Sequence, residues 1–290
     1  MLSLPEPGAP FHRLARTAAH RWWRPVLGTL ALAAAYLLME RLGSVLSFEE
    51  PGNTWVYRMA AGLLWAAALL AVLSIQARPA GTLASVLGRP RWRWLGSCLL
   101  EAATTAFVLS IGYGVVAFAT GVDYGSSIGT RQVVLTFLAF IAPTVLVAVA
   151  AELVFRGWLL QAMAAFGGGP WPANAVQAVL YAAVFCTFGP WSFTEGLVLS
   201  AVLGWLAVRT GGLEAGVALV VFLDLRTSFD EASFGLLTSD EPWIDAQWQF
   251  VALDLVMILV YASIVADLAR RRGLSTVAPG PSQAAVPAPV

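Results

Sequence analysis

Long apolar stretches separated by short polar segments dominate the pattern of this 290-residue chain. A run of about 20 apolar residues forms a helix long enough to cross the roughly 30 Å hydrocarbon layer of a bilayer. We therefore predict an all-α, polytopic membrane helix bundle with about eight transmembrane helices. Pro143 is expected to interrupt the fourth span, and the fifth to seventh are short. The predicted spans are 25–46, 55–76, 94–119, 132–163, 173–188, 193–209, 213–226 and 247–268.

The placement of arginine predicts the orientation of the bundle. Eight spans put both termini on one side, and most arginines outside the spans fall on that same side. By the positive-inside rule, both termini are predicted to be cytoplasmic. The arginines on that side are Arg13, Arg16, Arg21, Arg24, Arg78, Arg89, Arg91, Arg93, Arg209, Arg270, Arg271 and Arg272, and those on the other side are Arg41, Arg58, Arg131 and Arg226.

Three regions follow from this topology. Residues 1–24 form a cytoplasmic N-terminal segment, residues 25–268 the transmembrane helical domain, and residues 269–290 a flexible cytoplasmic tail rich in Pro, Ala, Ser and Gly. The acidic loop 227–246 is predicted either to lie on the outer interface as a short amphipathic helix or to form a solvated connection.

Composition supports the membrane assignment and limits the partners. Hydrophobic residues make up 59% of the chain, charged residues only 12%, and the mean hydropathy is +0.75, which excludes an ordinary water-soluble globule. Basic and acidic residues balance at 17 each, so no nucleic-acid partner is expected and the lipid bilayer is the environment. The basic residues are all Arg, a bias typical of GC-rich bacterial genes, which favours a multi-pass protein of the bacterial inner membrane.

Charges inside the apolar runs are the candidate functional positions, because a charge near the bilayer centre costs about 2.5 to 3.5 kcal/mol. Glu152 and Arg156 lie four residues apart in the fourth span, so on a helix they share a face and can pair. Glu101 and Asp254 lie one to two turns inside their spans, where a local hydrogen bond or interfacial placement accounts for them. Asp224 ends the seventh span.

The run from Ala150 to Gln161, AAELVFRGWLLQ, resembles the first signature, EExxxR followed by Gly and apolar residues, of the CPBP family. This family contains the CAAX prenyl endopeptidases and the related Abi and bacteriocin-immunity membrane proteins. The run from Gly204 to Leu213 also resembles the stretch that links the family's last core helices. The resemblance covers a CPBP-like core of about residues 132–226.

The resemblance implies an intramembrane metalloprotease fold with a zinc site. In the family, the first Glu of EExxxR activates a water, while histidines of an FxxxH motif and an HxxxN or HxxxD motif bind metal or stabilise the oxyanion. A carboxylate base and imidazole ligands suit peptide hydrolysis.

This sequence departs from the family at each of those positions. Ala151 stands at the first Glu, Phe185 at the first His and Val220 at the second His. The chain's only histidines, His12 and His20, precede the first span, so no realignment supplies a ligand.

The remnant motif residues are Glu152, Arg156 and Asp224, which are expected to converge as a polar network if the spans pack as in the family. We therefore expect no catalytic residues, no bound cofactor and a lost zinc site. Cys186, beside Phe185, has no partner base in the spans and is expected to be a small apolar filler.

Four functions remain open on these residues. The first is a pseudoenzyme that binds or regulates a membrane partner, such as a membrane protein or a lipidated peptide. The second is an active intramembrane CAAX-type endopeptidase whose mechanism differs from that of the family. The third is a small-molecule or ion transporter, and a purely structural subunit is a further reading.

Overall fold

The computed structural model describes residues 3–45, 54–121, 129–186, 189–236 and 246–280. Within these ranges the chain forms helices and turns, with isolated bridges but no strand. The helices are α1 (Trp23–Val45), α2 (Thr54–Gln76), α3 (Trp92–Thr120), α4 (Thr130–Glu152), η3 (Leu153–Leu159), α5 (Leu160–Ala164), α6 (Pro170–Phe185), α7 (Pro190–Thr210), α8 (Glu214–Ser233) and α9 (Trp248–Arg271), with short 3-10 turns η1 (Phe11–Arg13) and η2 (Ala80–Leu83). The predicted all-α bundle is confirmed.

Each predicted span corresponds to a helix or, for the fourth, to the continuous rod α4–η3–α5. Four of these elements are long and apolar enough to cross a membrane: Trp92–Thr120, Thr130–Ala164, Pro190–Thr210 and Trp248–Arg271. Proline at the first turn starts α6 and α7, where a missing N–H costs no hydrogen bond. Left-handed Gly121 and Gly211 end α3 and α7, because glycine adopts positive φ without strain.

Two predicted boundaries were wrong. The seventh span was expected to end at residue 226, but α8 continues to Ser233, so the first part of the predicted loop 227–246 is helical. Residues 237–245 of that loop lie outside the described residues. The fourth span was expected to break at Pro143, but α4 runs through this residue to Glu152. The irregular segment is instead η3, a π-helical stretch of seven residues that covers the EExxxR-like signature.

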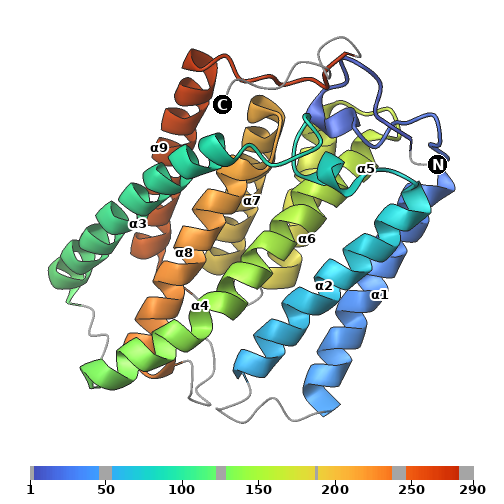
Figure 1. Ribbon diagram of the computed structural model, residues 1–290. Coiled ribbons are helices and arrows are strands. Elements are labelled where there is room, and N and C mark those ends of the chain that lie inside the picture. Colours follow the sequence, from blue (N-terminus) through green and yellow to red (C-terminus); the bar gives the residue numbers. More distant parts are fainter. Residues whose placement is uncertain (1–2, 46–53, 122–128, 187–188, 237–245, 281–290) are drawn as a thin grey trace.

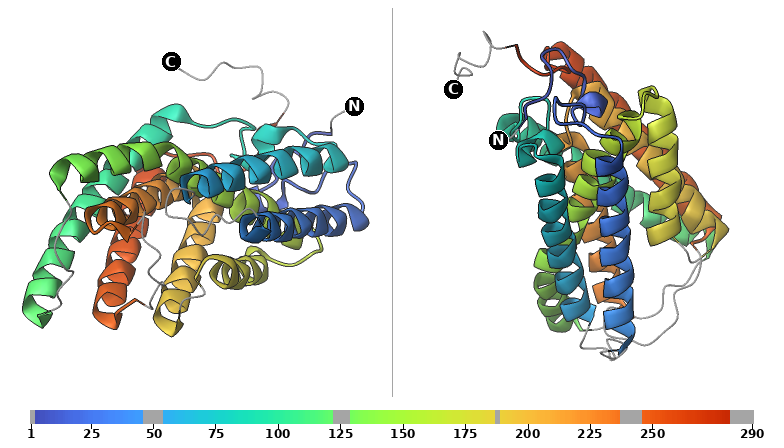
Figure 2. Two further views of the ribbon diagram at one scale, coloured as in Figure 1. Left: turned by 90° about the horizontal axis from the view of Figure 1, so that it is seen from below. Right: turned by 90° about the vertical axis from the view of Figure 1, so that its right-hand side faces the viewer.

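The helices form a bundle in which α8 packs against α3, α4 and α7, and α4 also packs against α2 (Figure 1). Helices α3, α9 and α7 lie side by side in a row (Figure 2). Large apolar side chains cover the outer surface, among them Phe118, which is 93% exposed, and Leu30, Leu70 and Leu100. An exposed apolar surface of this extent requires lipid as its solvent.

The two ends of the described chain lie at the same end of the bundle, as the topology predicted (Figure 1). Pro10 pairs with Val277, and the Ala278 N–H donates to the Ala9 carbonyl. Phe11 and Leu14 are fully buried in a cluster that also contains Ala278. Residues 1–24 were expected to form a plain cytoplasmic segment and residues 269–290 a flexible tail. In the structure α9 runs to Arg271, and Val277 and Ala278 pair with the N-terminal segment. Residues 281–290 lie outside the described ranges.

Candidate functional site

The signature pair sits at the junction of α4 and the π-helical η3. Glu152 ends α4, and Arg156 lies in the middle of η3. The Arg156 Nη1 and Glu152 Oε1 atoms are 2.7 Å apart, and both side chains are 0% exposed. The contact lacks hydrogen-bond geometry and is a direct ion pair. The predicted i,i+4 pairing is therefore present, with each charge removed from solvent.

Two other helices hold this pair in place. The Arg156 guanidinium lies over the ring of Tyr181 in α6, with Cζ 4.4 Å from the ring centroid, a cation–π contact. On the opposite side, Gly216 of α8 approaches Glu152 so closely that a Cβ atom there would be 2.5 Å from Oε2. The pair is thus enclosed by α4, η3, α6 and α8, and glycine at 216 is what allows α8 to come this close.

An aromatic cluster occupies the neighbouring space. It consists of Trp65 of α2, Phe155 of η3, and Tyr181 and Phe185 of α6. Their ring centroids are 5.0 to 6.1 Å apart. Phe185 stands at the family's first histidine position and packs against other aromatic rings. A histidine there would place polar ring nitrogens in this apolar cluster.

The other two positions at which this chain lacks the family's catalytic residues, Ala151 and Val220, also lie in apolar surroundings. Ala151 is 5% exposed and belongs to the same buried cluster as Phe155 and Tyr181. Val220 is 2% exposed and belongs to the cluster formed around α8 and α9. The side chains at these positions offer a methyl, a phenyl and an isopropyl group, none of which can bind a metal ion.

This donor set does not fit the zinc ion that the family resemblance implies. Zinc requires nitrogen, sulfur or carboxylate ligands, usually four in tetrahedral arrangement. Within the part of the chain that the structure describes, no group of three or more His, Cys, Asp or Glu side chains is placed to hold a metal ion. Glu152, the carboxylate next to Ala151 in the signature, forms an ion pair with Arg156 and is in close contact with Gly216.

Asp224 is not part of the ion pair, although its carboxyl group is close enough to Glu152 and Tyr181 to interact with them electrostatically. Gly216, Val220 and Asp224 are successive positions on one face of α8, so Asp224 lies two turns, about 12 Å, beyond the glycine that touches Glu152. Its side chain is half-buried and makes no ion pair or hydrogen bond with the described residues. It also lies in the middle of α8 instead of at its end, because the helix is longer than predicted.

A second polar group lies in the opposite half of the bundle. The Tyr113 hydroxyl of α3 donates to Asp254 of α9, which also shares a hydrogen bond with Glu195 of α7. Arg226 of α8 lies 4.3 Å from the Tyr113 ring centroid and donates to Asp230 at 2.6 Å. The local hydrogen bond expected for Asp254 is thus present, but it links helices.

Sequence reasoning missed Glu195, although the signal was available. It is an acid inside the predicted sixth span, and the rule that singled out Glu101 and Asp254 applies equally to it. Tyr181 and Gly216 gave no such signal, because tyrosine and glycine are ordinary residues of membrane helices.

The end of the signature contacts a buried cation outside the spans. The Arg78 Nη1 atom donates to Gln161 Oε1 at 2.5 Å, and its guanidinium lies 5.5 Å from the ring of Trp158. Arg78 is 2% exposed, and its Nε and Nη2 atoms have no acceptor among the described residues. Burial lowers the pKa of Arg78 to about 9, so the guanidinium keeps its charge at neutral pH. The GWLLQ run, residues 157–161, therefore connects the segment after α2 to η3 and α5.

The comparisons with known proteins agree with the signature. Residues 133–225 match the family described as Type II CAAX prenyl endopeptidase Rce1-like. No curated protein and no solved structure shows significant similarity to the chain. The matched segment begins in α4 and ends in α8, so it contains Glu152, Arg156, Tyr181 and Gly216. Residues 133–225 of this multi-pass membrane protein are thus similar to the Rce1-like, CAAX protease-like group of the CPBP family.

Proposed function

We propose that this protein is a non-catalytic CPBP relative, a pseudoenzyme that binds or regulates a membrane partner in the bacterial inner membrane. The observation that carries the proposal is the environment of Glu152: the carboxylate is fully buried, pairs with Arg156 at 2.7 Å and is covered by Gly216. A general base must reach the water whose proton it takes. A carboxylate that is 0% exposed and paired with an arginine is closed to water from the bulk solvent.

The three positions that lack the family's catalytic residues support the same conclusion. Hydrolysis of an amide requires stabilisation of the oxyanion as well as a base, and this stabilisation comes from a metal ion or from preorganised donors. Ala151, Phe185 and Val220 supply neither, and Phe185 belongs to the aromatic cluster. The family scaffold persists in its helices while the groups that would perform chemistry are hydrocarbon.

We infer that the partner is apolar and membrane-associated, either a lipidated peptide or a membrane protein. Residues 133–225 match a CAAX protease-like family, and Trp65 and Phe185 of the aromatic cluster are only half-buried, so their rings are accessible to an apolar ligand. The all-arginine basic composition, typical of GC-rich bacterial genes, supports the bacterial location.

The test combines binding with turnover. The purified protein in nanodiscs is titrated with a fluorescent farnesylated CAAX peptide and with the same peptide lacking the farnesyl group. We expect saturable binding of the farnesylated peptide alone and no cleavage. Cleavage that disappears in Glu152→Gln but persists in Glu101→Gln, a matched intramembrane control, would show instead that the chain is an active endopeptidase.

A transporter is a second candidate, and the polar group around Asp254 favours it. Tyr113, Glu195 and Arg226 surround this acid from three further helices, and ionisable groups inside a bundle commonly line ion or proton pathways. Proton or solute flux into proteoliposomes that is lost in Asp254→Asn, while peptide binding is retained, would favour this function over the first.

A further inference from the structure

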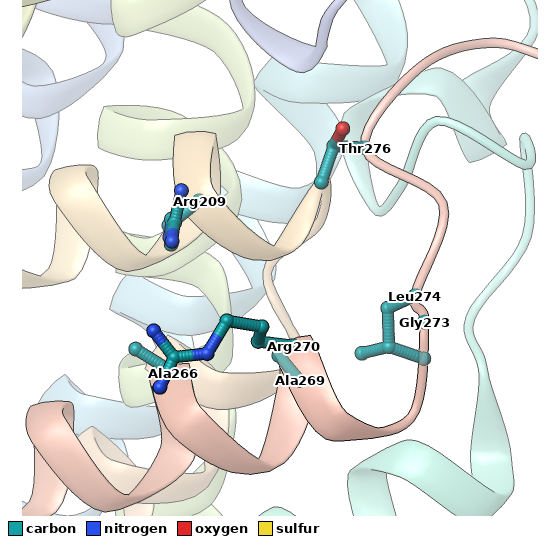
Figure 3. Close-up of a pocket in the computed structure, with 7 residues that line it drawn as sticks. All are labelled: Arg209, Ala266, Ala269, Arg270, Gly273, Leu274 and Thr276. Carbon is teal, nitrogen blue, oxygen red and sulfur yellow. The ribbon is translucent and has the colours of Figure 1, made fainter.

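A pocket opens between α7, α9 and the chain that follows α9. Its volume is about 190 Å³, and Arg209, Ala266, Arg270, Leu274 and Thr276 line it (Figure 3). Arg209 lies in the last turn of α7, and Arg270 lies in the last turn of α9. The pocket is therefore at the end of the bundle where both chain ends meet, which the arginine pattern places on the cytoplasmic side.

The pocket is positively charged. Figure 3 shows the Arg270 guanidinium extending along α9 toward Ala266, on the side where Arg209 projects from α7. Arg209 has no ion-pair or hydrogen-bond partner within the described ranges, and Asp267 is shared between Arg270 and Arg271. The ends of two helices each contribute about half a negative charge, which opposes an anion there. Arg209, Arg270 and Arg271 carry three positive charges against the one negative charge of Asp267, and this net charge of +2 outweighs that effect.

An apolar surface continues from the pocket toward the membrane interior. Arg270, Ala266, Ser263, Leu259 and Val256 follow a spacing of four and three residues, so they share one face of α9. Below the pocket this face is exposed, with Leu259 at 52% and Val256 at 55%. On α7, Trp205 lies one turn before Arg209 and is half-buried. Cationic groups above an exposed apolar stripe match an amphiphile with an anionic head.

We propose that this pocket binds the phosphate of an anionic phospholipid of the cytoplasmic leaflet, with the acyl chains along the exposed stripe of α9. Arg209 and Arg270 bind the phosphate oxygens. The inference needs the bilayer around the bundle but does not rest on the proposed partner-binding function. Basic pockets between helices on this side of a membrane suit anionic head groups.

The test uses the full chain in detergent, analysed by native mass spectrometry during titration with phosphatidylglycerol. Phosphatidylcholine with identical acyl chains isolates the contribution of head-group charge, and inorganic phosphate isolates that of the acyl chains. We expect one tightly retained phosphatidylglycerol, weaker phosphatidylcholine binding, and no saturable phosphate binding. The double variant Arg209→Gln/Arg270→Gln is expected to weaken phosphatidylglycerol binding by roughly thirtyfold.

Arg93→Gln is the matched control, because it removes one exposed cation at the same end of the bundle from a position outside the pocket. It is expected to change affinity less than threefold. Arg209→Lys/Arg270→Lys keeps the charge and is expected to retain most of the binding, which separates a charge effect from misfolding. Equal affinity for the two lipids, equal loss in the control and the double variant, or phosphate binding as tight as the lipid would each overturn the proposal.

Discussion

Replacing Arg156 with Met tests the central feature of the site, the enclosed ion pair. The substitution keeps an unbranched side chain of similar length in η3 but leaves Glu152 without its cation. Both side chains are 0% exposed, so solvent cannot compensate the remaining carboxylate. Removing one partner of such a pair typically costs about 3–5 kcal/mol. Loss of the cation–π contact with Tyr181 adds about 1 kcal/mol.

Removing both charges is expected to cost much less. In Glu152→Gln/Arg156→Met the uncompensated carboxylate is gone, and the expected loss relative to the native chain is about 1–2 kcal/mol. The difference between the double variant and the sum of the single variants is the coupling energy, which we expect to be at least about 2 kcal/mol. That value exceeds the roughly 0.6 kcal/mol average for interhelical hydrogen bonds in lipid.

The measurement is reversible unfolding of the purified variants in mixed micelles with increasing SDS, followed by tryptophan fluorescence and circular dichroism. Four proteins are required: the native chain, the two single variants and the double variant. Additive losses, with a coupling energy below about 0.5 kcal/mol, would refute the reasoning that the two charges stabilise each other. A native-like stability of Arg156→Met would refute the claim that the pair is sealed from water.

Three further predictions use the same unfolding assay. Gly216→Ala is expected to destabilise the fold by about 1–3 kcal/mol because its Cβ would meet the signature carboxylate at 2.5 Å, whereas Gly114→Ala, which meets nothing within 4 Å, should be neutral or stabilising by up to about 1 kcal/mol. Arg91→Ala is expected to cost about 3–5 kcal/mol because it leaves Glu214, 4% exposed and bound through both oxygens, without its cation, and Arg91→Lys should recover only part of this. Burial and the charge of Arg13 lower the pKa of His12 in the folded chain, so the unfolded chain binds more protons and the free energy of unfolding should fall as the pH drops below about 6.5. His12→Gln should flatten this pH dependence. An unchanged pH profile in that variant would contradict the burial argument.

Hydropathy predicted the helices because the length of an apolar run is a property of the sequence alone. It failed at the end of α8, where Asp230 and Glu231 make the window polar. In the structure Asp230 pairs with Arg226, and Glu231 pairs with Arg58 of α2 at 3.2 Å. Charges that find partners can remain in a helix within a bundle, and a hydropathy window contains no information about partners from other helices.

The site was predictable in its chemistry and less so in its geometry. The spacing of Glu152 and Arg156 predicted their pairing, because residues four apart share a helix face. The same reasoning could not place Asp224, since its position relative to the pair depends on how α8 lies against α4. Nothing in the local sequence indicated that Gly216 would mark the point of closest approach between those helices.

The π-helical stretch Leu153–Leu159 also limits how this chain can change in length. A π turn accommodates one more residue than an α turn, so deleting one residue here would let the segment relax to a regular α-helix. Residues after such a deletion would keep nearly the same angular position relative to α4, because the wide turn had absorbed the extra residue. A deletion within the regular part of α4 has no such compensation: it would turn every later residue by about 100° and take Trp158 and Gln161 out of their contacts with Thr29 and Arg78. Loss of one residue should therefore be tolerated within the π-helical stretch and strongly disfavoured in α4.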